Sequence, residues 1–253
     1  MAKRFKFMPT KLTNSSTAMS EFSFAPVAIV HSPYKQKFAI PRQPGLVTAA
    51  HGKIELLVDA PHQQVLRDIE QHSHLWLIFV FHATAEHGWK PLVKAPRLGG
   101  NKKTGVFATR STFRPNPIGM SVVKFDGISK VDQNLALDVS GLDLLDGTPI
   151  IDIKPYIPYS DSITGATSIM APSAESTFID IEFSDCAKQQ LQHLSAQYRD
   201  LPLFIEQVLL QDPRPAYKKL DLHCQQYGMS LYDLNIRWQI QENQCLVLSI
   251  EKH

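Results

Sequence analysis

The most apolar stretch of the chain is Leu75-Trp-Leu-Ile-Phe-Val-Phe-His82. Its Leu, Ile, Val, Phe and Trp residues are typical of a strand that is buried on both faces. The unbroken apolar run ends at Phe81 after seven residues, whereas a membrane-spanning helix needs ~20. The stretch therefore predicts an inner strand of a globular core, and we expect no membrane contact.

Further strand patterns lie on both sides of this stretch. We expect strands at Pro26–His31, Lys53–Val58, Val106–Thr109, Met120–Ile128 and Leu135–Val139. Val65–Glu70 could form a short helix. Short strands with turn residues between them, and little helix, favour a small barrel or sandwich over alternating strands and helices. No G-x-G-x-x-G motif follows a strand, so a dinucleotide-binding fold has no support.

The pattern changes after Pro155–Ser176, a stretch without periodicity that indicates a linker or an ordered loop. Thr177–Phe183 alternates as a strand, and Ser184 can cap a helix with Ala187, Leu191, Leu194 and Tyr198 on one face. A second amphipathic helix is expected at Leu203–Leu210, and paired strands at Leu234–Ile240 and Cys245–Ile250 around a Glu242-Asn243 turn.

These patterns predict a mainly β protein in two parts. We expect a small β-barrel N-terminal domain over residues 24–160 and a smaller α+β C-terminal domain over residues 177–253. A linker is expected at residues 161–176, and residues 1–23 are expected to form an N-terminal extension.

The composition is that of a globular protein. Of 253 residues, 43% are hydrophobic and 20% are charged, so wholesale disorder is excluded. No long apolar stretch follows the basic N-terminus, so we expect no secretion signal. The cysteines Cys186, Cys224 and Cys245 are odd in number and widely spaced, which fits neither a disulfide framework nor a zinc motif. We expect a cytoplasmic protein.

The net charge of +2 conceals an uneven distribution. Residues 1–160 carry 19 Lys and Arg against 12 Asp and Glu, whereas residues 161–253 carry 7 against 12. Eight basic residues and no acidic residue lie between His87 and Phe125. This excess indicates either a phosphate-bearing partner or a solvated loop with scattered charge.

Four segments combine polar residues with special backbone residues, namely 32–45, 73–82, 105–119 and 142–148. Each has a structural alternative, since Pro-Asn-Pro is a rigid turn and Asp-Gly is a common hairpin turn. Asp143 and Asp146 lack a further ligand at a suitable spacing, so we expect no metal. A hydrolase triad could be drawn from Ser111, His82 and Asp146, but no G-x-S-x-G turn supports it.

Together these segments resemble the TsaA-like family of tRNA methyltransferases. The resemblance rests on phrases such as Thr112-Phe-Arg-Pro-Asn-Pro-Ile-Gly119 and Gln211-Asp-Pro-Arg-Pro-Ala-Tyr217, and it covers residues 24–253. It implies a β-barrel, a homodimer, and S-adenosylmethionine (SAM) bound near the subunit interface. It also implies methyl transfer to N6 of N6-threonylcarbamoyladenosine at position 37 of threonine tRNA.

The chemistry of SAM suggests which residues would hold it. A carboxylate suits a guanidinium, so Arg42 or Arg110 could bind the SAM carboxylate, and Asp143 or Asp146 could bind the ribose hydroxyls. Pro41, Arg42 and Gln43, with Phe81 and His82, are expected to contact the adenine or methionine part. With the resemblance we further place Met120, Leu144 and Leu145 in the cofactor site.

Methyl transfer depends largely on positioning, but the urea-like acceptor nitrogen needs a group that takes or holds its proton. His82 and Asp212 are the candidates. We expect Lys102, Lys103, Arg114 and Arg214 to bind the tRNA substrate. For Arg214 an alternative remains, in which its guanidinium pairs with an acid in its own domain.

Two other function classes remain open at this point. One is a SAM-dependent methyltransferase that acts on another RNA or on a small molecule. The other is a non-catalytic RNA-binding barrel, which a tRNA-binding assay with and without SAM would separate from an enzyme.

Overall fold

The computed structural model describes residues 22–58, 61–94, 103–168, 179–214, 218 and 223–253. The expectations for the N-terminal extension up to residue 21, for Lys102 and for part of the linker lie outside these residues. The described chain is mainly β with few helices, as the sequence predicts. No helix in this part of the chain has the length and hydropathy needed to cross a lipid bilayer.

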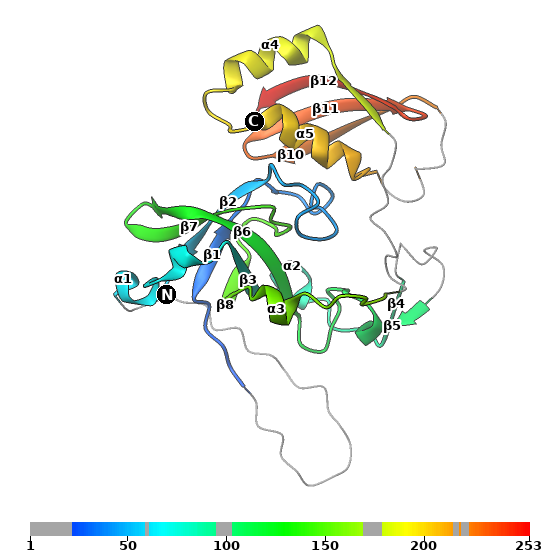
Figure 1. Ribbon diagram of the computed structural model, residues 1–253. Coiled ribbons are helices and arrows are strands. Elements are labelled where there is room, and N and C mark those ends of the chain that lie inside the picture. The colour runs from blue at the N-terminus through cyan, green and yellow to red at the C-terminus, as the bar shows by residue number, and fades with distance from the viewer. Residues whose placement is uncertain (1–21, 59–60, 95–102, 169–178, 215–217, 219–222) are drawn as a thin grey trace.

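Six strands close into a ring in the first part of the chain (Figure 1). They follow one another in the order β1 (Ala28–His31), β2 (His51–Leu56), β7 (Asn134–Ser140), β6 (Ile118–Val131), β3 (His74–Val80) and β8 (Pro149–Pro155). All neighbours are antiparallel, and the pairing of Ala28 with Ile150 joins the last strand to the first. Alternate residues such as Leu75, Leu77 and Val123 fill the interior.

Some expected elements of this part differ in the structure. Val106–Thr109 is not a strand: Val106–Ala108 forms a 3-10 helix, and the Thr109 hydroxyl donates to the Val106 carbonyl at 2.9 Å. The expected helix at Val65–Glu70 is replaced by α1 (His62–Val65) and a 3-10 turn at Ile69–Gln71. Between these two lies Asp68, whose left-handed φ of 66° interrupts a helix.

Smaller elements surround the ring. The inner strand ends at Val80, so His82 lies not on it but at the start of a short helix, α2 (His82–Ala85). β4 (Leu92–Lys94) and β5 (Lys103–Gly105) form a separate two-stranded ladder. After β8 comes α3 (Pro158–Asp161), whose Asp161 accepts a hydrogen bond from the Trp76 indole at 2.8 Å.

The C-terminal unit is a four-stranded sheet with two helices. The strand order is β10 (Gln225–Leu231), β11 (Leu234–Gln241), β12 (Gln244–Lys252) and β9 (Asp180–Phe183), with β9 parallel to β12. Ser184 caps α4 (Asp185–Leu194) as predicted, because its hydroxyl accepts from the Ala187 amide at 3.1 Å. The turn after β11 contains Glu242, with a left-handed φ of 52°.

Helix α5 (Leu201–Leu210) lies between this sheet and the ring (Figure 1). Phe204 packs edge-on against Tyr34, with ring centroids 5.7 Å apart. The Tyr232 amide donates to the Pro33 carbonyl at 2.7 Å, and the Gln207 side chain accepts from the Ala49 amide at 2.9 Å. The C-terminal unit therefore holds the chain on both sides of residues 35–47.

Candidate functional site

A cavity of about 450 Å³ opens beside β3 and β6. Its walls come from residues 37–44, from the end of β3 with α2, from the loop before β6, from the start of β6, and from the loop after β7. The structure brings together ten of the eleven expected cofactor residues there: Pro41, Arg42, Gln43, Phe81, His82, Arg110, Met120, Asp143, Leu144 and Leu145. Segments far apart in the sequence thus form one site.

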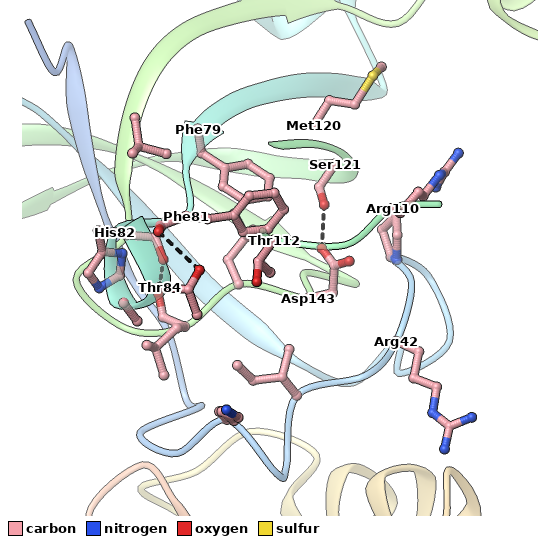
Figure 2. A pocket seen from close by; sticks show the side chains of 18 of the residues that line it. Arg42, Phe79, Phe81, His82, Thr84, Arg110, Thr112, Met120, Ser121 and Asp143 are labelled. Atoms are coloured by element: carbon pink, nitrogen blue, oxygen red, sulfur yellow. Dashed lines mark hydrogen bonds between the residues drawn. The ribbon is translucent and has the colours of Figure 1, made fainter. Parts of the chain in front are cut away.

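An aromatic pair forms one wall of the cavity (Figure 2). The rings of Phe79 and Phe81 meet edge to face, with centroids 5.1 Å apart. They lie directly against Gly119, where an added Cβ atom would come within 2.4 Å of Phe79 and 2.8 Å of Phe81. The glycine in the Pro-Asn-Pro-Ile-Gly phrase is therefore required by this close approach and not by a turn.

Asp143 is the buried carboxyl group of the cavity wall. It accepts a hydrogen bond from the Ser121 hydroxyl (Figure 2). Burial raises its pKa to about 6, although this hydrogen bond and the positive charge of Arg110 act in the opposite direction. Above that pH the site holds a desolvated negative charge that can accept hydrogen bonds from a hydroxyl or ammonium group.

Two guanidinium groups lie on the side of the cavity away from His82 (Figure 2). Arg110 donates a hydrogen bond to the Gln43 side chain, which ties the loop before β6 to residues 37–44. Arg42 comes from the same segment as Gln43. This side of the cavity can bind a carboxylate through charge-assisted hydrogen bonds.

His82 lies half-buried at the opposite side. Burial lowers the pKa of its imidazole, and a hydrogen bond to the Val80 backbone partly counteracts this. The ring is therefore neutral near pH 7 and has a nitrogen lone pair with which it can accept a proton.

Asp146 does not line the cavity. Its carboxylate accepts from the Ser32 amide at 2.8 Å and pairs with Lys35 at 2.7 Å. The following Gly147 has a left-handed φ of 74°, as in the turn that an Asp-Gly pair favours. Of the two aspartates between which the sequence could not choose, Asp143 faces the cavity and Asp146 shapes the loop.

Of the expected substrate residues that the structure describes, Lys103, Arg114 and Arg214 do not line the cavity. Lys103 is exposed on β5. The Arg114 guanidinium donates to the Thr109 carbonyl at 2.7 Å and lies over the Phe107 ring, so it braces the loop that carries Arg110.

Asp212 and Arg214 form a two-point ion pair in the C-terminal unit, with distances of 2.8 and 3.1 Å. Their side chains are only 3% and 8% exposed. This burial favours the alternative in which Arg214 pairs with an acid of its own domain. Neither residue lines the cavity.

Other chemistries find little support in this geometry. Of the triad candidates, Asp146 and Ser111 do not line the cavity with His82, and Ser111 accepts from the Phe113 amide. Among the described residues, no group of three or more His, Cys, Asp or Glu side chains could hold a metal ion.

Sequence reasoning missed five polar residues of the cavity wall: Lys37, Thr84, Thr112, Ser121 and Thr148. For Ser121 a signal exists, because it is a polar residue at an inward position of the apolar stretch that begins β6. Thr84 and Thr112 lie in a short helix and a loop, where no periodicity marks the direction of a side chain.

The chain is similar to known methyltransferases over most of its length. The chain is 46% identical over 233 residues to the tRNA (adenine(37)-N6)-methyltransferase of Escherichia coli K12, covering 92% of this chain and 99% of that protein. It is 45% identical over 217 residues to a Pseudomonas aeruginosa protein, RcsF, whose name assigns it provisionally to the S-adenosylmethionine-dependent methyltransferases, covering 85% and 91%. A crystal structure of TrmO from Pseudomonas aeruginosa superposes with a TM-score of 0.76 and 37% identity, covering 92% and 99%.

Family models match both parts of the chain. The tRNA-methyltransferase O N-terminal domain matches residues 29–162, and the TrmO C-terminal domain matches residues 176–253. With these matches, and with a relative of 46% identity across nearly its whole length, the chain belongs to the tRNA-methyltransferase O (TrmO) family.

Proposed function

We propose that the chain is a SAM-dependent methyltransferase that methylates N6 of adenine 37 in tRNA. The observation that carries this proposal is the cavity, where an aromatic pair, two guanidiniums and a buried carboxyl group face one volume of about 450 Å³. These groups fit the parts of SAM, which has apolar, cationic, anionic and hydroxyl-bearing regions. SAM supplies the methyl group.

Within this proposal each side of the cavity has a role. Arg110, held by Gln43, binds the SAM carboxylate. Asp143 accepts hydrogen bonds from the SAM ammonium or ribose hydroxyls. The faces of Phe79 and Phe81 favour a positive charge beside them through cation–π attraction. Met120, Leu144 and Leu145 complete the wall.

His82 is the proton acceptor in this proposal. Its depressed pKa leaves a lone pair free near neutral pH, and it can take the proton that the acceptor nitrogen loses on methylation. Asp212 is a weaker candidate for this role, since its carboxylate is bound by the Arg214 guanidinium.

The full substrate follows from the family resemblance: N6-threonylcarbamoyladenosine at position 37 of threonine tRNA, encountered in the cytoplasm. The test is mass spectrometry of anticodon-loop fragments from cells that lack the gene. Returning the chain on a plasmid should add one methyl group to that nucleoside in threonine tRNA, and an Asp143→Ala variant should not restore it. An unchanged modification pattern would contradict the proposed substrate.

The two parts of the chain have separate tasks in this proposal. Residues 24–160 form the SAM-binding barrel, because every strand of the ring lies between Ala28 and Pro155. Residues 161–176 connect it to residues 177–253, in which β9, β10, β11 and β12 pair with one another in one sheet.

We further propose a homodimer. Met120 lines the cavity yet is 53% exposed, so the cavity wall is open to solvent there. Its cross-strand neighbour is Ile78. Tyr159 and Ile163, which follow β8, are also largely exposed. An apolar area of this kind is typical of a subunit interface. Sedimentation of the wild-type chain should give twice the monomer mass, and Met120→Lys should lower that mass.

A further inference from the structure

A second cavity, of about 420 Å³, lies between the ring and the C-terminal unit. Its walls come from residues 45–51, from the start of β3, the middle of β6 and the end of β7, and from the chain entering α5. The polar side chains that face it are Thr48, His51, His74, Lys124, Asp126, Ser140, Arg199 and Asp200. None of these residues has a part in the cofactor site.

The two cavities are lined by neighbouring parts of the chain. Pro44 lines one cavity and Gly45 the other. Along β6, Met120 belongs to the cofactor cavity and Lys124 to the second one. Four residues of strand correspond to about 13 Å. A strand of RNA with one nucleotide at the cofactor cavity can therefore reach the second cavity with a neighbouring part.

The charges of the second cavity suit a ligand with both anionic and hydrogen-bond-donating groups. Lys124 pairs with Asp126 at 2.9 Å, and Arg199 with Asp200 at 3.4 Å. The two cationic side chains are 62% and 74% exposed, and ion pairs this exposed hold their partners weakly. The cations are thus available to a phosphate, whereas the carboxylates can accept from a 2′-hydroxyl or a base edge.

The second cavity also has an apolar surface. Leu203, in the first turn of α5, is 46% exposed and lines the cavity together with Val122. An unstacked base offers an apolar face of this kind, and single-stranded RNA loops are recognised through such splayed bases. The two carboxylates would repel a simple anion here, and Lys124 and Arg199 would repel a simple cation.

We propose that this second cavity binds a nucleotide of the tRNA anticodon loop next to the one that is methylated, with Lys124 and Arg199 on its phosphate. The inference rests on the proposed function and moves the RNA contact of the C-terminal unit from the buried Arg214 to the exposed Arg199.

The test uses the full chain and tRNA from cells that lack the methyltransferase gene. Lys124→Ala and Arg199→Ala should each raise the Kd for tRNA about tenfold, the loss expected for a charge-assisted hydrogen bond. Each should also reduce the slope of log K against log salt by about 0.7. The KM for tRNA should rise with little change in kcat, and the Kd for SAM should stay the same.

Matched controls remove the same charge elsewhere. Lys130→Ala changes an exposed lysine farther along β6, and Lys188→Ala changes one on α4. The inference is wrong if Lys124→Ala and Arg199→Ala alter tRNA affinity no more than these controls do. A wild-type chain that neither binds nor methylates tRNA would instead contradict the proposed function itself, which is a different result.

Discussion

If Asp143 binds SAM as proposed, cofactor binding is expected to be sensitive to pH. Its pKa is raised to about 6, so we expect the Kd for SAM to increase as the pH falls through 6 and the acceptor charge is lost. Calorimetry between pH 5 and 8 measures this. His82 is another titratable group of the cavity wall, so His82→Gln serves as the control and should retain the part of the pH dependence that is due to Asp143.

The raised pKa of Asp143 has the opposite effect on the stability of the fold, which is expected to be higher at low pH. A carboxyl whose pKa is higher in the folded state than its ordinary value of 3.8 stabilises the fold at low pH, and this stabilisation is lost as the pH rises through about 6. We therefore expect Asp143→Asn to raise the melting temperature above pH 6 while it weakens SAM binding. A variant that melts lower at pH 8 would show that the charged form stabilises the fold.

Arg214 is expected to matter for folding. Removing one partner of a buried ion pair leaves an uncompensated charge, with a cost of about 3–5 kcal/mol. Arg214→Ala should thus melt several degrees lower, whereas Arg237→Ala, at an exposed position of the same unit, should not. If Arg214→Ala keeps its stability and loses only methylation of tRNA, the guanidinium binds substrate instead.

At the scale of elements, the contact between β6 and the aromatic pair allows a clean test. A Cβ atom at Gly119 would lie 2.4 Å from Phe79, so Gly119→Ala must displace the wall of the cavity. We expect at least a tenfold loss of SAM affinity, equal to about 1.4 kcal/mol. The matched control is Gly105→Ala, where an added Cβ meets nothing within 4 Å. Equal SAM affinity in both variants would contradict the proposal that this aromatic pair forms a wall of the SAM site.

The elements that the sequence predicts well are those with a strong apolar signal. Leu75–Phe81 indicates β3, which ends at Val80, but the expected burial on both faces is wrong: Leu75, Leu77 and Phe79 are buried, whereas Trp76 and Ile78 on the outer face are only partly buried. In contrast, β8 begins and ends with proline, and β10 begins with Gln225-Gln226, so their sequences resemble loops. Pairing with neighbours makes them strands, and this tertiary contribution outweighs local propensity.

The candidate site was predictable to a similar degree. Sequence motifs identified the segments that meet at the cavity, but they could not show which of Asp143 and Asp146 lines it. That choice depends on burial: one carboxylate faces the cavity wall, and the other is held by Lys35 and Ser32. The second cavity has no counterpart in any single motif, because its lining comes from the ring and from the chain entering α5.

At the scale of the whole molecule, the C-terminal unit is expected to influence the cofactor site. The Gln207 side chain accepts a hydrogen bond from the Ala49 amide at 2.9 Å, and the Tyr232 amide donates one to the Pro33 carbonyl at 2.7 Å. These two bonds lie on either side of residues 35–47. Gln207→Ala should therefore raise the Kd for SAM a few-fold, because residues 35–47 would be less ordered before binding and would lose more conformational entropy when SAM binds. Gln192→Ala, an exposed change on α4, should leave it unchanged. Identical values for the two variants would show that the units act independently.

The closure of the ring through β1 and β8 has a consequence for synthesis on the ribosome. Ala28 cannot meet Ile150 until the whole of β8 has been translated, and loop closure over so long a segment is slow. In the C-terminal sheet, β12 lies between β9 and β11, so that sheet must wait until Gln244–Lys252 has been translated. Residues 35–47 therefore gain their second support only after β12 has been translated, and the nascent chain is expected to complete its SAM site late.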